Sequence, residues 1–210
     1  MTQNDDIQAL LDFFDTLIPL TENEKDLVKE KFQPHSYRRR ENVLQEGEIC
    51  RYYHFVVKGC LRMYKTDNEG TIHIIKFAAE NDWMTDIPSY YTLKPSSLHI
   101  DALEATEVLR IRRNDLLDMY MHAQRFDRIF RILTENDLAK LQQRHLESIS
   151  ATAEERYESF LNDYSNLTNR LSQVQIASFL GITPEFLSRM RNRQVRSSSE
   201  NEKESPHGIS

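Results

Sequence analysis

The sequence has few of the residues on which several protein classes depend. Two cysteines among 210 residues are too few for a disulfide-rich secreted scaffold, and five glycines and six prolines exclude a collagen-like or low-complexity chain. No run of apolar residues approaches the roughly 18 that a membrane span needs. The N-terminal residues are acidic and amphipathic, whereas a signal peptide begins basic and continues apolar. We therefore expect a cytoplasmic protein without a membrane partner.

Charge is unevenly distributed along the chain. The formal net charge is −6, which is not typical of a nucleic-acid-binding protein. Residues 183–196 nevertheless hold four arginines and one glutamate. Such a basic segment can bind phosphates, so the whole-chain charge hides a candidate nucleic-acid contact. With 39% hydrophobic residues the chain can bury one sizeable core, with or without a small satellite domain.

The first half of the chain predicts two short helices followed by strands. Apolar residues have helical spacing over 7–32, and Thr21 with Glu24 forms a capping box for the second helix. Between about 36 and 112, short apolar runs alternate with turn residues, and the segment TDNEGT predicts a hairpin. This pattern predicts a small β-sandwich or barrel. Its expected interior residues are Leu44, Phe55, Val57, Leu61, Ile72, Ile74, Phe77, Ile100 and Val108.

A long helical section follows. Residues 114–150 contain no glycine or proline, and a break near 122–124 divides them into a short and a long helix. An apolar stripe on the long helix must be buried, either against its own β domain or against the same helix of a second subunit. We expect the homodimer. The stripe comprises Phe126, Ile129, Phe130, Leu133, Leu138, Leu141, His145 and Ile149.

Residues 171–193 predict a helix-turn-helix. Ser172 caps a first helix that ends at Leu180, and Gly181 supplies the left-handed conformation of a sharp turn. Thr183 caps the second helix, and Pro184 occupies its first position. The polar outer face of the second helix can reach base edges and phosphates in a major groove. The alternative is a helical hairpin without a DNA role. The predicted DNA-binding residues are Ser172, Gln173, Thr183, Glu185, Phe186, Ser188, Arg189, Asn192 and Arg193.

The order of these parts resembles the Crp/Fnr (catabolite-activator-like) family of transcription regulators. The segment QIASFLGITPEFLSRMR is the most specific part, and GEICRYYHFVVKGCLRMY and ALEATEVLRI resemble the family's strands. The amino-acid sequence as a whole is most similar to the subgroup common in Bacteroidetes-type bacteria. The resemblance implies an α+β fold with a cyclic-nucleotide-binding-like β-roll (jelly roll), a long dimerisation helix and a helix-turn-helix domain. The expected boundaries are 1–122 for the sensory domain, 123–150 for the helix, 151–196 for the DNA-binding domain and 197–210 for a disordered tail.

The resemblance places an effector pocket in DWMTDIPSYYTLKPSSLHI, but key residues differ. The family's phosphate-binding Gly-Glu pair and Arg fall on Thr85, Asp86 and Ser96. Serine cannot replace the bidentate bonds of a guanidinium, and a second family arginine falls near Asp137. We therefore expect no cAMP binding, and the effector, if one exists, is unknown. The candidate pocket residues are Trp83, Thr85, Asp86, Ser96 and Ser97.

No cofactor or metal is expected. An iron–sulfur sensor needs about four cysteine ligands, whereas this chain has only Cys50 and Cys60. These are more typical of buried thiols than of a redox switch. The histidines that a haem sensor could use as axial ligands stand in no distinctive motif; they are His54, His73, His99 and His122.

In the second helix, the family's base-contacting residues fall on Glu185 and Arg189, while an earlier family arginine is Pro184 here. The family's wing strands have no apolar counterpart after residue 193, which should weaken DNA binding. The expected partners are a palindromic duplex DNA, a second subunit and, by resemblance, RNA polymerase. The rival functions are an effector-binding or protein-interaction module that has lost DNA binding, and a cupin-like metal enzyme, for which the ligand spacing is absent.

Overall fold

The computed structural model describes residues 3–201, with side chains for residues 5–193. The chain divides into two compact units, one up to Gln143 and one from Arg144 onward. The division falls inside the long helix α5 (Gln124–Ser150), not at either of its predicted ends. Within residues 3–201, no helix has the length and apolar content to cross a membrane.

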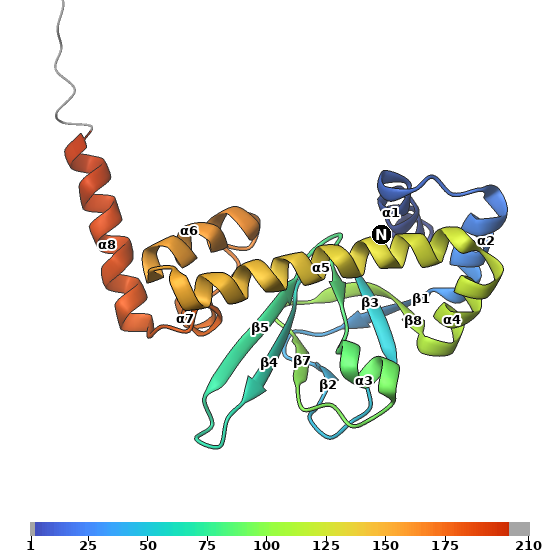
Figure 1. The fold of residues 1–210 in the computed structure, drawn as a ribbon, viewed down its shortest axis with the longest axis horizontal. Helices are drawn as coiled ribbons and strands as arrows, with labels where there is room; N and C mark the ends of the chain where they lie inside the picture. Colours follow the sequence, from blue (N-terminus) through green and yellow to red (C-terminus); the bar gives the residue numbers. More distant parts are fainter. Residues whose placement is uncertain (1–2, 202–210) are drawn as a thin grey trace, which may run out of the picture. The chain divides into compact units, whose positions relative to one another are not determined.

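The first unit is built around eight antiparallel strands in two sheets (Figure 1). One sheet has the order β1-β8-β3-β6, and the other has the order β2-β7-β4-β5. Apart from the β4–β5 hairpin, successive strands alternate between the two sheets, which confirms the predicted β-roll. The strands are β1 (Gln33–Tyr37), β2 (Asn42–Leu44), β3 (Tyr52–Lys58), β4 (Leu61–Thr66), β5 (Ile72–Ala78), β6 (Trp83–Met84), β7 (His99–Ala102) and β8 (Thr106–Arg112).

Turn chemistry explains the strand ends. The hairpin predicted from TDNEGT joins β4 to β5, and in it the Asp67 carboxylate accepts hydrogen bonds from the backbone N–H groups of Glu69 and Thr71 at 2.9 Å. Most of the predicted interior is buried, but Ile72 is 38% exposed and Val57 is only half-buried. The prediction for Ile72 was wrong because the residue lies at the end of β5 beside the hairpin turn, where no second layer covers it.

Helices pack on the sheet that contains β3 and β8. They are α1 (Gln3–Leu17), α2 (Glu22–Lys31), α4 (Arg113–His122) and the first part of α5, while the short α3 (Ile87–Thr92) lies between β6 and β7 (Figure 1). The helix break predicted near 122–124 is at Ala123. The Trp83 ring lies within 6.2 Å of six aromatic rings from α1, β3, α5 and the end of α2. In this cluster, the first part of α5 packs against the β-roll.

One glycine gives a stability prediction. Gly59 has φ +98°, and a Cβ there would lie 2.6 Å from Thr106 Oγ1 and 2.7 Å from the Ala105 carbonyl oxygen. Gly47 has a similar φ of +89° but open space around it. We expect Gly59→Ala to lower the free energy of unfolding in urea by about 2–4 kcal/mol, and Gly47→Ala by about 1 kcal/mol, because only the first adds overlap to backbone strain. Equal losses would contradict the predicted overlap at Gly59.

The second unit is helical. It contains α6 (Ala153–Asp163), α7 (Gln173–Leu180) and α8 (Pro184–Asn201). Its core includes Phe160, Phe179 and Leu187, and the Arg144 guanidinium lies 3.9 Å from the centre of the Phe179 ring. Residues 197–201, predicted as part of a disordered tail, continue α8, because nothing before Pro206 stops a helix there. The remainder of the predicted tail, 202–210, lies outside the described residues.

Candidate nucleic-acid interface

A tight turn joins α7 to α8 with the chemistry predicted from the sequence. Ser172 and Gln175 form a reciprocal cap at the start of α7: the Ser172 N–H donates to Gln175 Oε1 at 2.7 Å, and the Gln175 N–H donates to Ser172 Oγ at 3.3 Å. Gly181 ends the helix with φ +67°. These contacts fix where α7 stops and where the chain turns.

The start of α8 is equally well defined. The Phe186 N–H donates to Thr183 Oγ1 at 3.2 Å, so Thr183 caps the helix and Pro184 follows at its first position. On the inner side, Ala177 and Leu187 are completely buried, and Met190 is 2% exposed. The small Ala177 side chain allows close packing between α7 and α8. One side of α8 is therefore committed to the core, which leaves the opposite side for solvent or a partner.

All nine predicted DNA-binding residues are exposed or half-buried. Five of them, Glu185, Phe186, Ser188, Arg189 and Asn192, share the outer side of α8. Thr183 lies at the start of that helix and Arg193 at the edge of the same side, whereas Ser172 and Gln173 lie at the start of α7. The structure therefore groups most of the predicted set on one helical face, beside the beginning of the preceding helix.

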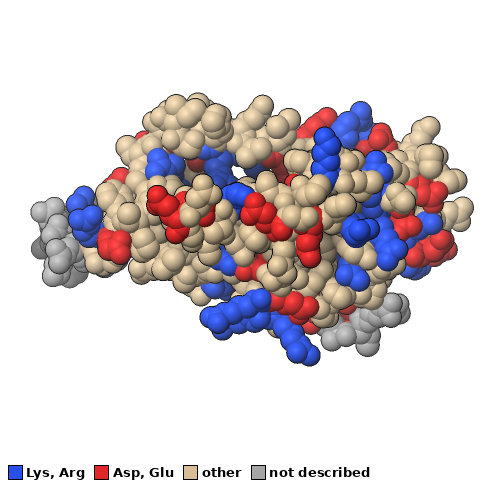
Figure 2. Space-filling model, turned by 90° about the horizontal axis from the view of Figure 1, so that it is seen from below, with Lys and Arg blue, Asp and Glu red and all other residues tan. Residues whose placement is uncertain are grey.

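The charge on this face is available to a ligand. The Arg189 guanidinium lies 5.9 Å from the Phe186 ring, and among side chains of residues 5–193 neither Arg189 nor Arg193 forms an ion pair. Elsewhere, basic and acidic side chains are intermingled over the face drawn in Figure 2 rather than forming a continuous field. A net negative protein can thus present local positive charge.

The predicted effector residues are divided by the structure. Asp86 and Ser96 meet: Ser96 Oγ donates to Asp86 Oδ2 at 2.6 Å, and each residue is only 4% exposed. Asp86 also caps α3 through the Ser89 N–H. Ser96, which the resemblance places at the position of the family's phosphate-binding arginine, thus forms a hydrogen bond with the Asp86 carboxyl group. The pair consists of a carboxyl group and a hydroxyl, and neither side chain is a cation that could bind an anionic ligand.

The other three predicted pocket residues differ from this pair in their burial and contacts. Trp83 is a core residue of the aromatic cluster, and Ser97 is exposed. Thr85 is buried and donates to the Tyr52 carbonyl oxygen at 3.1 Å. Asp137, near which the resemblance placed a second arginine, forms an ion pair of 2.7 Å with Lys76. The sequence does not indicate Lys76 as the partner of Asp137, because 61 positions separate the two residues and no local motif connects them.

The histidines considered for haem have local partners. Burial lowers the pKa of His54 to about 3, so the ring is neutral. Its Nδ1 donates to the Met84 carbonyl oxygen at 3.3 Å, and its Nε2 accepts from the Tyr37 hydroxyl at 3.1 Å. His73, His99 and His122 lie beside carboxylates. Among the described residues, no three histidine, cysteine, aspartate or glutamate side chains are grouped as metal ligands.

Comparisons with known proteins agree with this architecture. Residues 34–123 match the model of the cyclic nucleotide-binding domain. FixK2 from Bradyrhizobium japonicum is 24% identical with a TM-score of 0.68, over 80% of this chain and 86% of FixK2. CLP from Xanthomonas campestris, described as a c-di-GMP-responsive global regulator, is 11% identical with a TM-score of 0.69, over 85% of this chain and 93% of CLP.

A third solved structure is named as a Crp/Fnr-family transcriptional regulator from Eubacterium rectale. It is 18% identical with a TM-score of 0.66, over 88% of both chains. No curated protein matches the sequence. At identities this low, the structural similarity establishes a shared fold and nothing further. Residues 34–123 thus form a domain of the cyclic nucleotide-binding type, and the chain's structural neighbours include regulators of the Crp/Fnr family.

Proposed function

We propose that this protein is a homodimeric, sequence-specific DNA-binding transcription regulator of the Crp/Fnr type, without enzymatic activity, that acts in the cytoplasm. The observation that carries the proposal is the outer side of α8, where Glu185 and Arg189 stand one helical turn apart, exposed, on a helix held by a capped turn. A glutamate can accept from a cytosine amino group, and an arginine can bridge a guanine edge. RNA polymerase and a small-molecule effector are further proposed partners.

Dimerisation is proposed from α5. Four aliphatic side chains on this helix are more than half exposed in the single chain: Leu138 (52%), Leu141 (58%), Leu146 (57%) and Ile149 (72%). Water-exposed leucines one helical turn apart are stabilised when a second helix covers them. A dimer would present two copies of α8 to half-sites about ten base pairs apart, as a palindrome requires.

We also propose that the β-roll does not bind cAMP, because the bonded Asp86–Ser96 pair stands where a phosphate would need cations. The proposed organisation keeps 1–122 as the sensory domain, 123–150 as the dimerisation helix and 151–196 as the core of the DNA-binding domain. The narrower resemblance to the Bacteroidetes-type subgroup remains a prediction.

The test is selection of binding sites from random duplex DNA with the full-length protein at low salt. We expect enrichment of one palindrome whose half-site centres are about ten base pairs apart. Parallel selection with saturating cAMP should enrich the same sequence to the same degree. Enrichment that depends on cAMP would overturn the proposal for the β-roll. Enrichment of a site that is not a palindrome would overturn the proposal that two copies of α8 in a dimer contact the DNA.

A second function has one observation in its favour. After Arg193 the chain continues as helix to Asn201, where related winged domains would need strands, so phosphate contacts from a wing are not available from these residues. This favours an effector-binding or protein-interaction module that has lost DNA binding. Such a module would enrich no sequence, either with purified protein or with cell extract as a source of effector, although it would still form the dimer.

A further inference from the structure

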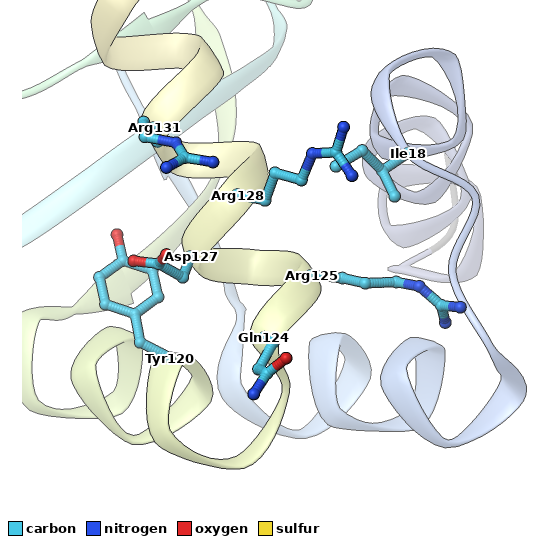
Figure 3. Close-up of a pocket in the computed structure, with 7 residues that line it drawn as sticks. All are labelled: Ile18, Tyr120, Gln124, Arg125, Asp127, Arg128 and Arg131. Atoms are coloured by element: carbon cyan, nitrogen blue, oxygen red, sulfur yellow. The ribbon is translucent and has the colours of Figure 1, made fainter.

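A hollow of about 520 Å³ lies in the first unit where α1, α4 and α5 meet. Three arginines from successive turns of α5, Arg125, Arg128 and Arg131, belong to its lining, and Figure 3 shows Arg128 projecting toward Ile18. Ile18 and Tyr120, both half-buried, supply its apolar surface. Gln124 and Asp127 complete the lining. The hollow belongs neither to the proposed DNA-binding face nor to the Asp86–Ser96 pair.

One of the three arginines already holds a carboxylate. Arg125 Nη1 lies 2.7 Å from Glu24 Oε2, and the side chain of Glu24 is only 13% exposed. Burial opposes ionisation of Glu24, but hydrogen bonds from Thr21 and Arg125 outweigh it and lower the pKa of the carboxyl. The pair shows that a guanidinium group at this end of α5 binds a carboxylate.

The next two arginines are free. Arg128 and Arg131 are exposed, and neither forms an ion pair with any side chain of residues 5–193. Residues three apart on a helix have Cβ atoms about 5–6 Å apart, so two carboxylates of one short peptide can reach both. Asp127, although it stands at i−4 from Arg131, is not paired with it; its carboxylate can accept from a peptide N–H or hydroxyl.

We propose that this hollow is a docking site for an acidic segment of a partner protein. Two carboxylates of the segment bind Arg128 and Arg131, and an apolar side chain between them packs against Ile18, toward which Arg128 projects (Figure 3). The combination favours a peptide over a nucleic acid, because Asp127 and Glu24 would repel a continuous run of phosphates, whereas a peptide can alternate acidic groups with donors and apolar groups. The hollow is too open to enclose a small ligand, which also favours a segment anchored to a larger partner.

The experiment measures fluorescence anisotropy of the labelled peptide Gly-Ser-Glu-Leu-Glu-Ser-Gly with the full-length protein. Wild-type protein should bind it in about 50 mM salt and more weakly in about 300 mM, because exposed charges are screened. The amide peptide Gly-Ser-Gln-Leu-Gln-Ser-Gly should not bind. Arg128→Gln combined with Arg131→Gln should weaken binding by about 3- to 10-fold, the range expected for two exposed ion pairs.

Two further variants separate this site from general charge effects. Glu24→Gln releases Arg125 while its amide oxygen still accepts from Thr21, so the helix cap is kept and peptide binding should tighten by about 2-fold or more. Arg38→Gln combined with Arg39→Gln removes the same charge from an exposed turn and should leave binding unchanged.

Equal losses in the two double variants, or no gain with Glu24→Gln, would overturn the proposal. It would also fail if the Arg128 and Arg131 changes weakened binding to duplex DNA and left peptide binding unaltered. That result would assign the arginines to phosphates.

Discussion

Replacing Arg189 with alanine should reduce affinity for the selected palindrome by at least about 10-fold while leaving binding to random DNA much less affected. A bidentate arginine–guanine contact contributes about 1–3 kcal/mol of discrimination, and a dimer makes the contact twice. Arg189 is exposed and forms no ion pair with residues 5–193, so its removal leaves no buried charge behind. Fluorescence anisotropy with the selected and scrambled duplexes gives both affinities.

A matched control lies on the same helix. Arg191 is exposed, but at two residues from Arg189 it points about 200° away around α8. Arg191→Ala should change the two affinities by the same factor, as expected for a residue that contributes only general charge. If Arg189→Ala kept its discrimination between the two duplexes, or if Arg191→Ala lost it, α8 would not read bases with the predicted face.

The helices α7 and α8 and the turn between them were predictable because their determinants are local. Ser172, Gly181, Thr183 and Pro184 each act within four residues of their own position, through caps and a left-handed turn that the sequence specifies directly. The same holds for the hairpin at Asp67. Such signals need no knowledge of the rest of the fold, and the structure places all of them at the predicted positions.

The arrangement of the predicted effector-pocket residues depends on contacts that no local pattern specifies. Trp83 was expected to line it, yet the ring is surrounded by Phe13, Phe14 and Phe130 from helices far away in the sequence. The hydrogen bond between Asp86 and Ser96 joins two residues that are ten positions apart. The path of the chain between them depends on α3 and its cap. Burial of a polar residue against a specific partner is a tertiary property, so the sequence identified the residue types without their arrangement.

The stripe on α5 shows the same limit in one element. Periodicity predicted a single apolar line, but the structure divides its members into two classes. Phe126, Ile129 and Phe130 are buried against the β-roll, whereas Leu138 and Leu141 are more than half exposed. Both interpretations of the stripe, packing on the chain's own domain and packing on a second subunit, thus have residues to support them, and the second is the one that predicts a dimer.

Leu141→Asp should convert the dimer to monomer at micromolar concentration. Covering a leucine side chain contributes about 1.5–3 kcal/mol, and a two-fold dimer loses that contribution twice. The introduced carboxylates would also face each other across the interface. We therefore expect the dimer dissociation constant to rise by at least about 100-fold, measured by sedimentation velocity. Affinity for the palindrome should also fall. In a dimer, binding of one subunit to its half-site raises the effective concentration of the second subunit at the other half-site, and a monomer lacks this effect.

Ala139→Asp is the control for this change. Ala139 is exposed on α5 and lies about 160° around the helix from Leu141, so the substitution introduces the same charge away from the proposed contact. It should leave both the dimer and DNA affinity within about 2-fold of wild type, apart from a small loss of helix propensity. Dissociation by both variants would indicate damage to the helix itself. A Leu141→Asp protein that remained dimeric would show that a different surface joins the subunits, and the exposed leucines would then need another partner.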